Sequence, residues 1–265
     1  MQSPPSPILV DICGFKIHYY GLILFIAIIT AIAVIRTIAK KYYKNTDFDI
    51  ILDILPSIIL CSILGARLYY VLMDFSYFST HPSEIIAIWN GGMSIHGGII
   101  GGILSGLIIA KIKKISFLLY ADVFSYGLII GQAIGRFGNY FNCEAFGKPC
   151  NIPFIKLHIP SEFRPTGYEH YDYFHPTFLY ESIWNIAVFI ILLLVVRKLK
   201  NIKTGTIFFS YMILYSIGRI FIEWCRMDSV LNIWGMPIAQ IVSAIIIVLS
   251  GVTLAIINKK EKTGS

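Results

Sequence analysis

Long apolar runs alternate with short polar stretches along this chain. Each run is close to the roughly 20 apolar residues that an α-helix needs to cross the hydrocarbon core of a bilayer. We therefore predict an all-α membrane protein, a bundle of seven transmembrane helices that forms one integral membrane domain over residues 1–265. The predicted spans are residues 19–36, 48–72, 92–110, 117–135, 176–196, 205–223 and 236–257.

The connection between the fourth and fifth predicted spans, residues 137–175, is the longest stretch outside the spans. We expect it to form an irregular segment on the outer side, because long loops in compact proteins are often functional or flexible. Its prolines are Pro149, Pro153, Pro160 and Pro165.

Lysine and arginine residues cluster on every second connection, while residues 74–91, after the second span, contain neither. Basic loops stay in the cytoplasm. We therefore predict an amino terminus outside the cell and a carboxyl terminus in the cytoplasm. The clusters contain Arg36, Lys40, Lys41, Lys44, Lys111, Lys113, Lys114, Arg197, Lys198, Lys200, Lys203, Lys259, Lys260 and Lys262.

The composition excludes an ordinary soluble domain. Hydrophobic residues make up 56% of the chain and charged residues 14%, whereas soluble domains carry about 25% charged residues. The net charge of +7 lies mainly in the predicted cytoplasmic loops, where it favours anionic headgroups over nucleic acid.

The amino terminus lacks a basic region and a cleavage site, so we expect no cleaved signal peptide. Five cysteines without a C-x-x-C pair indicate no metal site, although Cys143 and Cys150 could pair.

Four arginines stand at or near the outer ends of predicted spans. Ionisable groups inside a span cost several kcal/mol unless they are paired or hydrated, and guanidinium groups match phosphate and carboxylate geometry. We therefore expect an anionic partner at this face, with an interhelical salt-bridge network as the alternative. The arginines are Arg67, Arg136, Arg219 and Arg226.

The sixth span carries a polar stripe. Tyr215, Arg219, Glu223 and Arg226 fall at positions i, i+4, i+8 and i+11, which places them on one face of a helix. In an otherwise apolar helix this face must contact protein or water. The same two interpretations, an anion site and a structural network, remain open for the stripe.

Two further spans carry candidate chemistry. His96 lies about one turn inside the outer end of the third span and precedes glycines spaced by four, a spacing that favours close helix packing. A histidine can accept a proton near neutral pH, but this position fits a structural hydrogen bond equally well.

The fourth span ends in GRFGNYFNCEAFG (135–147), a dense run of polar residues. Its two interpretations are a functional site and a helix cap with a salt bridge. Asp53 and Asp122 lie toward the inner ends and are expected to be structural.

GRFGNYFNCEAFG resembles the signature G-R-x-G-N-F-x-N-x-E-x-x-G of the bacterial phosphatidylglycerol–prolipoprotein diacylglyceryl transferase family, with Tyr140 in place of the usual phenylalanine. The stripe at 215–226 also matches a family motif, and so do three shorter segments. These are HYYG (18–21), SIHGG (94–98) and HPTFLYE (175–181).

The resemblance implies an enzyme that transfers the diacylglyceryl group of phosphatidylglycerol to the lipobox cysteine thiol of a preprolipoprotein. The products would be a thioether and glycerol 1-phosphate. It implies a multi-pass protein of the bacterial inner membrane, with its site toward the outer side, and partners that are phosphatidylglycerol, lipobox signal peptides and membrane lipids. The residues carried over as catalytic are Tyr20, His96, Arg136, Glu144, Arg219 and Glu223. Those carried over as lipid-binding are Arg136, Asn139, Gly147, Arg219, Tyr215 and Arg226.

The residue chemistry is consistent with that activity. Arginines held in a site poor in water would stabilise the charge that develops on a leaving phosphate, and we assign this role to Arg136 and Arg219, with Asn139 as a neutral donor. A free thiol is only a few per cent thiolate at neutral pH, so a base would help. His96 is the candidate base, while Glu144 and Glu223 either share this work or hold the arginines. We expect no cofactor and no metal.

Three other functions fit a polar membrane protein. An anion transporter or lipid flippase usually shows internal repeats and a site near the midplane, and neither is visible here. An intramembrane hydrolase would need H-E-x-x-H or G-x-S-x-G, which the chain lacks. A non-catalytic receptor or scaffold for signal peptides remains the third alternative.

Overall fold

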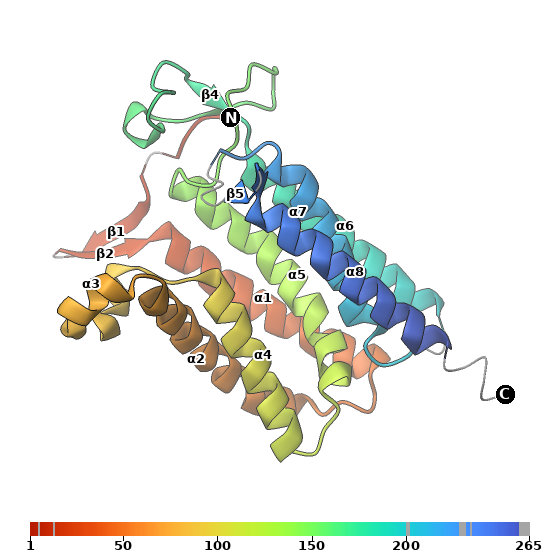
Figure 1. The fold of residues 1–265 in the computed structure, drawn as a ribbon. Helices are drawn as coiled ribbons and strands as arrows, with labels where there is room; N and C mark the ends of the chain where they lie inside the picture. Colours follow the sequence, from red (N-terminus) through yellow and green to blue (C-terminus); the bar gives the residue numbers. More distant parts are fainter. Residues whose placement is uncertain (5, 13, 200–201, 228–231, 234, 260–265) are drawn as a thin grey trace. The chain divides into compact units, whose positions relative to one another are not determined.

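The computed structural model describes residues 1–265 except 5, 13, 200–201, 228–231, 234 and 260–265 (Figure 1). Within this described part, seven helices are long and apolar enough to cross a membrane, which confirms the predicted fold class. They are α1 (Tyr19–Tyr42), α2 (Phe48–Met73), α4 (Ile95–Ile112), α5 (Phe117–Phe141), α6 (Thr177–Lys198), α7 (Thr206–Glu223) and α8 (Ile238–Lys259).

Short elements occupy several of the connections. Each of the described hairpins is antiparallel and two-stranded: β1 with β2, β3 with β4, and β5 with β6. The strands are β1 (Ile8–Ile12), β2 (Phe15–His18), β3 (Leu157–His158), β4 (Tyr173–Phe174), β5 (Asn232–Ile233) and β6 (Met236–Pro237). The short helices are α3 (Phe75–Thr80) and the 3₁₀ turns η1 (Pro82–Ile86), η2 (Ile88–Asn90) and η3 (Ser161–Phe163).

Several helices extend past the predicted spans. Helix α1 continues to Tyr42, and Lys40 and Lys41 lie in its last turn, where positive charge is favourable beside the carbonyl end of a helix. Helix α5 continues to Phe141. In both helices the apolar run ends first, and polar residues then continue the helical hydrogen bonding for several more positions. Arg136 and Asn139 therefore lie on α5 itself and not in a loop.

The chain divides into two compact units. The first comprises Met1–Tyr42 with Ala121–Ser265, and the second comprises Tyr43–Tyr120. Helices α1, α6, α7, α8 and most of α5 belong to the first unit, and α2 and α4 to the second. The single domain over residues 1–265 stays a prediction, as does the side of the membrane on which each terminus lies.

The second unit is held together by close contact between α2 and α4. A Cβ atom added at Gly101 would overlap the carbonyl oxygen of Cys61, and one added at Gly97 would overlap the carbonyl oxygen of Gly65. Small residues of this kind let two helix backbones approach each other. The expected packing role of the third-span glycines is confirmed.

In the first unit, a buried carboxylate joins the start of α7 to α5. The two side-chain oxygens of Asp122 accept hydrogen bonds from the backbone N–H groups of Gly205 and Phe208, each at 2.7 Å. Asp122 is fully buried, and the N–H groups at a helix start need such acceptors. The structural role expected for Asp122 is confirmed.

The segment between α5 and α6 carries its own small core. Phe146, Leu157, Ile159, Phe174 and Phe178 are buried against one another, and β3 pairs with β4 within it. The segment is therefore more ordered than its prolines suggest. The candidate pair Cys143 and Cys150 is not bridged, because both residues carry free thiols.

Candidate active site

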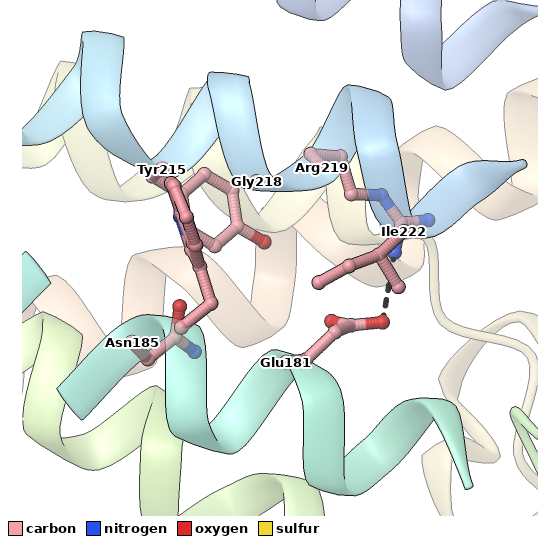
Figure 2. Close-up of a pocket in the computed structure, with 7 residues that line it drawn as sticks. Glu181, Asn185, Tyr215, Gly218, Arg219 and Ile222 are labelled. Atoms are coloured by element: carbon pink, nitrogen blue, oxygen red, sulfur yellow. Dashed lines mark hydrogen bonds and ion pairs between the residues drawn. The ribbon is translucent and has the colours of Figure 1, made fainter. Parts of the chain in front are cut away.

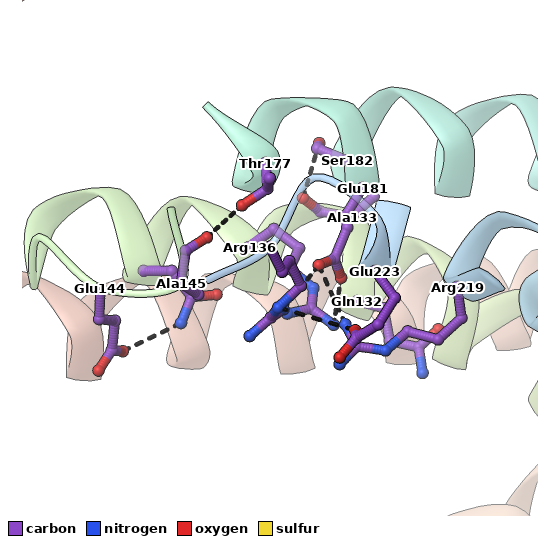
Figure 3. A network of polar contacts seen from close by, with 12 residues as sticks. Gln132, Ala133, Arg136, Glu144, Ala145, Thr177, Glu181, Ser182, Arg219 and Glu223 are labelled. Carbon is purple, nitrogen blue, oxygen red and sulfur yellow. Dashed lines mark hydrogen bonds and ion pairs between the residues drawn. The ribbon is translucent and has the colours of Figure 1, made fainter. Parts of the chain in front are cut away.

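Three guanidinium groups meet at one buried carboxylate in the first unit. Glu181, in the second turn of α6, is 4% exposed. Its Oε2 lies 2.5 Å from Nη2 of Arg136 on α5, and its Oε1 lies 3.2 Å from Nη1 of Arg219 on α7. Oε1 also accepts from Nη1 of Arg226 at 2.9 Å. Figure 3 shows Arg136 and Arg219 approaching Glu181 from different helices.

A second buried carboxylate completes this arginine cluster, which we define as Arg136, Arg219 and Arg226 with Glu181 and Glu223. Glu223 Oε2 lies 2.9 Å from Nη2 of Arg219 and 3.9 Å from Nε of Arg226. Arg219 thus bridges both carboxylates. The predicted face is confirmed for Arg219 and Glu223, because Arg219 on α7 reaches Glu181 of α6. For Arg226 the prediction of a shared helical face is wrong: α7 ends at Glu223, and Arg226 lies beyond the helix, where its backbone bridges to Gly147.

The arginine cluster is paired and also partly accessible. Three guanidiniums face two carboxylates, so the cluster carries one net positive charge when all five groups are ionised. The side chains of Arg136 and Arg219 keep 20% and 21% of their surface exposed, whereas those of Glu181 and Glu223 keep only 5% and 3%. The expected salt-bridge network is therefore present, and its exposed surface is cationic. An incoming anion would meet guanidinium groups before it met the carboxylates.

The turn after α5 presents a second polar group. Glu144 Oε1 accepts hydrogen bonds from Nδ2 of Asn139 at 3.0 Å and from Nδ2 of Asn142 at 3.2 Å. Cys143 and Ala145 flank Glu144 with φ values of 51° and 52°. Such left-handed conformations cost about 1–2 kcal/mol for residues with a Cβ atom. This unusual turn holds Glu144 against the last turn of α5.

Gly147 lies where the backbone crosses the end of α7. Its N–H donates to the carbonyl of His175 at 2.8 Å, and Gly147 pairs with Arg226 in an isolated bridge. A Cβ atom there would lie 2.5 Å from the carbonyl oxygen of Cys225. The glycine is thus required for close backbone approach, and its predicted contact with lipid stays a prediction.

The two predicted tyrosines lie beside this region of the first unit. Tyr20, in the first turn of α1, is 41% exposed, and its ring covers Gly138 of α5, where a Cβ atom would lie 2.6 Å from Cδ2 of the ring. Tyr215 lines a small cavity together with Arg219, one turn before it on α7. Figure 2 shows the side chains of Tyr215 and Arg219 on the face of α7 toward α6. Among the residues that the structure describes, no hydrogen bond or ion pair assigns a chemical role to Tyr20 or Tyr215.

His96 belongs to the second unit, in the first turn of α4. Its exposed ring lies 6.0 Å from the ring of Tyr69, centroid to centroid. Its expected place beside the arginine cluster of the first unit stays a prediction.

Arg67, also in the second unit, is occupied by the backbone. Its guanidinium donates to the carbonyl groups of Glu84, Ile85, Gly91 and Gly92 at 2.5–2.9 Å, and the residue is 7% exposed. Arg67 therefore fixes the connection between α2 and α4, and this use of its donors does not support the anion-binding role expected for it.

Glu181 is the central residue that the sequence analysis did not single out. Its signal was present: a carboxylate inside a predicted span is expensive unless it is paired, and Glu181 ends the HPTFLYE segment. Nothing local in that segment marks Glu181 as the acidic partner shared by three arginines from other segments. Among the described residues, no group of three or more His, Cys, Asp or Glu side chains is arranged to hold a metal ion.

Comparison with known proteins gives consistent matches along the chain. A family model described as prolipoprotein diacylglyceryl transferase matches residues 7–257. Proteins named phosphatidylglycerol–prolipoprotein diacylglyceryl transferase are similar over nearly the full length. The Trichormus variabilis protein is 45% identical over 96% of this chain and 88% of its own length. The Clostridium novyi protein is 42% identical over 97% and 98%, and the Bacillus velezensis protein is 41% identical over 94% and 90%.

Proposed function

The chain belongs to the prolipoprotein diacylglyceryl transferase family, and on that premise we propose that it transfers the diacylglyceryl group of phosphatidylglycerol to a cysteine thiol of a preprolipoprotein. In this step the sulfur bonds to the glyceryl carbon that carries the phosphate. The carbon–oxygen bond to the phosphate breaks, and its electron pair leaves with glycerol 1-phosphate. The thiol proton passes to a base, and the product is a thioether.

The observation that carries this proposal is the convergence of Arg136 and Arg219 on Glu181 from two different helices. Departure of glycerol 1-phosphate develops negative charge on phosphate oxygens. Fixed guanidinium donors lower the barrier because they need no reorganisation as that charge forms. Glu181 and Glu223 hold these donors in place, and the exposed guanidinium surface binds the phosphate. Arg226 supports the same surface through both carboxylates.

The incoming thiol must lose its proton to become a strong nucleophile. Since only a few per cent of a free thiol is thiolate at neutral pH, a proton acceptor beside the sulfur increases the reactive fraction. We assign this role to His96, with Glu144 and Glu223 as the alternatives. Asn139 supplies a neutral donor toward the lipid. Tyr20, Gly147 and Tyr215 complete the proposed contacts with the headgroup region.

The proposed setting is the bacterial inner membrane, with the site toward the outer leaflet. Its support is the alternation of basic connections, which predicts α7 to end on the outer side. The proposed partners are signal peptides with a lipobox cysteine, phosphatidylglycerol and surrounding lipids. We assign no role to nucleic acid.

The decisive experiment is a mass measurement on a lipobox peptide incubated with the purified full chain in phosphatidylglycerol vesicles. We expect the peptide to gain the mass of one diacylglyceryl group. A matched peptide with alanine in place of the lipobox cysteine should gain none. A transporter, a flippase or a signal-peptide scaffold would leave both masses unchanged, and that outcome would refute the proposal.

A further inference from the structure

A small cavity lies between α6 and α7, beside the arginine cluster. Its volume is about 10 Å³, which is room for roughly one water-sized group. Glu181 and Asn185 line it from α6, and Tyr215, Arg219 and Ile222 line it from α7 (Figure 2). The cavity therefore borders Arg219 of the arginine cluster and includes both Glu181 and Asn185, which are one helical turn apart on α6.

Asn185 is a buried donor that faces this cavity without a partner. The residue is 2% exposed, and its Nδ2 has no hydrogen-bond partner among the residues that the structure describes. Leaving a buried polar group unsatisfied costs about 1–3 kcal/mol. The neighbouring donor is different, because Trp184 Nε1–H already donates to the carbonyl of Leu214 at 2.9 Å. Asn185 is thus the group in this wall that lacks an acceptor.

The size and charge of the cavity restrict what that acceptor is. The headgroup glycerol is too large for a volume of about 10 Å³. A phosphate would face the carboxylate of Glu181 at the same site, and like charges repel. A neutral carbonyl oxygen fits both limits, since it fills one water-sized space and only accepts hydrogen bonds. The apolar lining from Trp184 and Ile222 suits the ester region of a lipid.

We propose that Asn185 is a lipid-binding residue whose Nδ2 donates to an ester carbonyl oxygen of the diacylglyceryl group. This inference rests on the proposed function. Asn185 lies one turn beyond Glu181, about 6 Å along α6. In a phospholipid the ester carbonyls are only a few bonds from the phosphate. A lipid whose phosphate contacts Arg219 can therefore place an ester oxygen at Asn185. Two fixed points, phosphate and ester, then orient the glyceryl carbon that the sulfur attacks.

The test compares two lipids in two proteins. The lipids are diester phosphatidylglycerol and its dialkyl ether analogue, in which each ester carbonyl becomes a methylene group. The readout is kcat/KM for transfer to the lipobox peptide. In the unaltered protein we expect the ether lipid to be about tenfold poorer, because one hydrogen bond to a buried donor is lost. In Asn185→Leu the donor is absent, so the two lipids should differ by less than about twofold.

Control variants separate binding from structure. Ser182→Ala removes another buried donor of α6, one that lies outside the cavity lining and already donates to the carbonyl of Ala133, so we expect it to keep the tenfold preference for ester lipid. If Asn185→Leu does not fold, Asn185→Ala removes the donor with less bulk. The inference is overturned if the unaltered protein treats both lipids alike, or if the Asn185 variants keep the preference, as they would if the cavity only held a structural water. Absence of transfer from either lipid by the unaltered protein would instead refute the proposed function.

Discussion

Arginines at helix ends serve opposite purposes in the two units of this protein. In the second unit, Arg67 donates to four backbone carbonyls and is buried. Gly91 and Gly92 bring two of those carbonyls to it with φ values of 83° and 72°. In the first unit, Arg136 and Arg219 pair with carboxylates and keep about a fifth of their side chains exposed, at 20% and 21%.

The difference shows that a charged residue in a membrane helix is not by itself a binding site. Neutral carbonyls that surround a guanidinium use up its donors and enclose it, which orders a loop. Buried carboxylates such as Glu181 anchor a guanidinium from one side and leave the other side cationic. The kind of group that pairs with an arginine, and the fraction of its side chain that stays exposed, therefore indicate function better than the presence of the arginine does. Substitutions at Arg136, His96, Glu181 and Arg67, with a control at Arg164, test this distinction and the roles of the two units.

Replacing Arg136 should have the largest effect on transfer. We expect Arg136→Ala to lower kcat by about 10³-fold, the upper range for loss of a preorganised donor, while the protein remains folded and inserted. Arg136→Lys should not restore the rate, because an ammonium lacks the planar fork that fits a phosphate. Steady-state transfer on protein checked by size-exclusion chromatography measures both variants.

The matched control for Arg136 is Arg164 in the same unit. Arg164 pairs with Asp172 and with the Ile159 carbonyl instead of with Glu181 or Glu223, so Arg164→Ala should keep transfer within about threefold. Near-normal turnover in Arg136→Ala would remove Arg136 from the mechanism.

His96 tests whether the second unit contributes chemistry as well as structure. We expect His96→Gln to lower kcat by about 10²-fold, the lower range for loss of a general base, because glutamine keeps a polar side chain but does not accept the thiol proton. Added imidazole should restore part of the rate in His96→Ala. If both variants turn over normally, a carboxylate or water is the base, and the second unit is a scaffold.

Glu181→Gln tests how the carboxylate anchors its arginines. The amide has nearly the same shape but removes one negative charge, so the hydrogen bonds to Arg136, Arg219 and Arg226 weaken. We expect kcat to fall about tenfold, equivalent to one charge-assisted hydrogen bond. KM for phosphatidylglycerol should not rise, because the cluster becomes more cationic. A rise in KM with an unchanged kcat would mean that Glu181 only aids lipid binding.

The smallest effect on transfer should come from Arg67→Met. The loss of its hydrogen bonds should lower the free energy of unfolding by about 1.5–3 kcal/mol. Transfer per folded molecule should change by less than about threefold. Thermal unfolding in detergent and transfer normalised to folded protein measure the two quantities. A large loss of kcat with unchanged stability would contradict the distinction between the two kinds of arginine.

Much of this architecture could be predicted from local pattern. An apolar run of about 20 residues has few alternatives to a membrane helix, so the seven helices follow from the sequence. The face shared by Tyr215, Arg219 and Glu223 follows as well, since helical periodicity is a property of one segment, whereas Arg226 lies beyond the end of α7. The exact helix ends did not follow, because polar residues continue α1 and α5 beyond the apolar runs.

Contacts between helices depended on the tertiary structure. Glu181 and Asn185 share a face of α6, yet nothing in that segment states that Glu181 receives arginines from α5 and α7 while Asn185 faces a cavity. Nor does the sequence separate Arg67 from Arg136, because both are single arginines near the end of an apolar run. Their different roles arise from what the fold places around each guanidinium.

The sequence by itself therefore determined the membrane class, the seven long apolar helices and which residues carry charge within them. The tertiary structure alone decided which charges meet and which donor lacks an acceptor. The physical reason is range: helix formation and periodicity depend on neighbours a few residues apart, whereas ion pairs and cavities depend on packing between segments far apart in the chain.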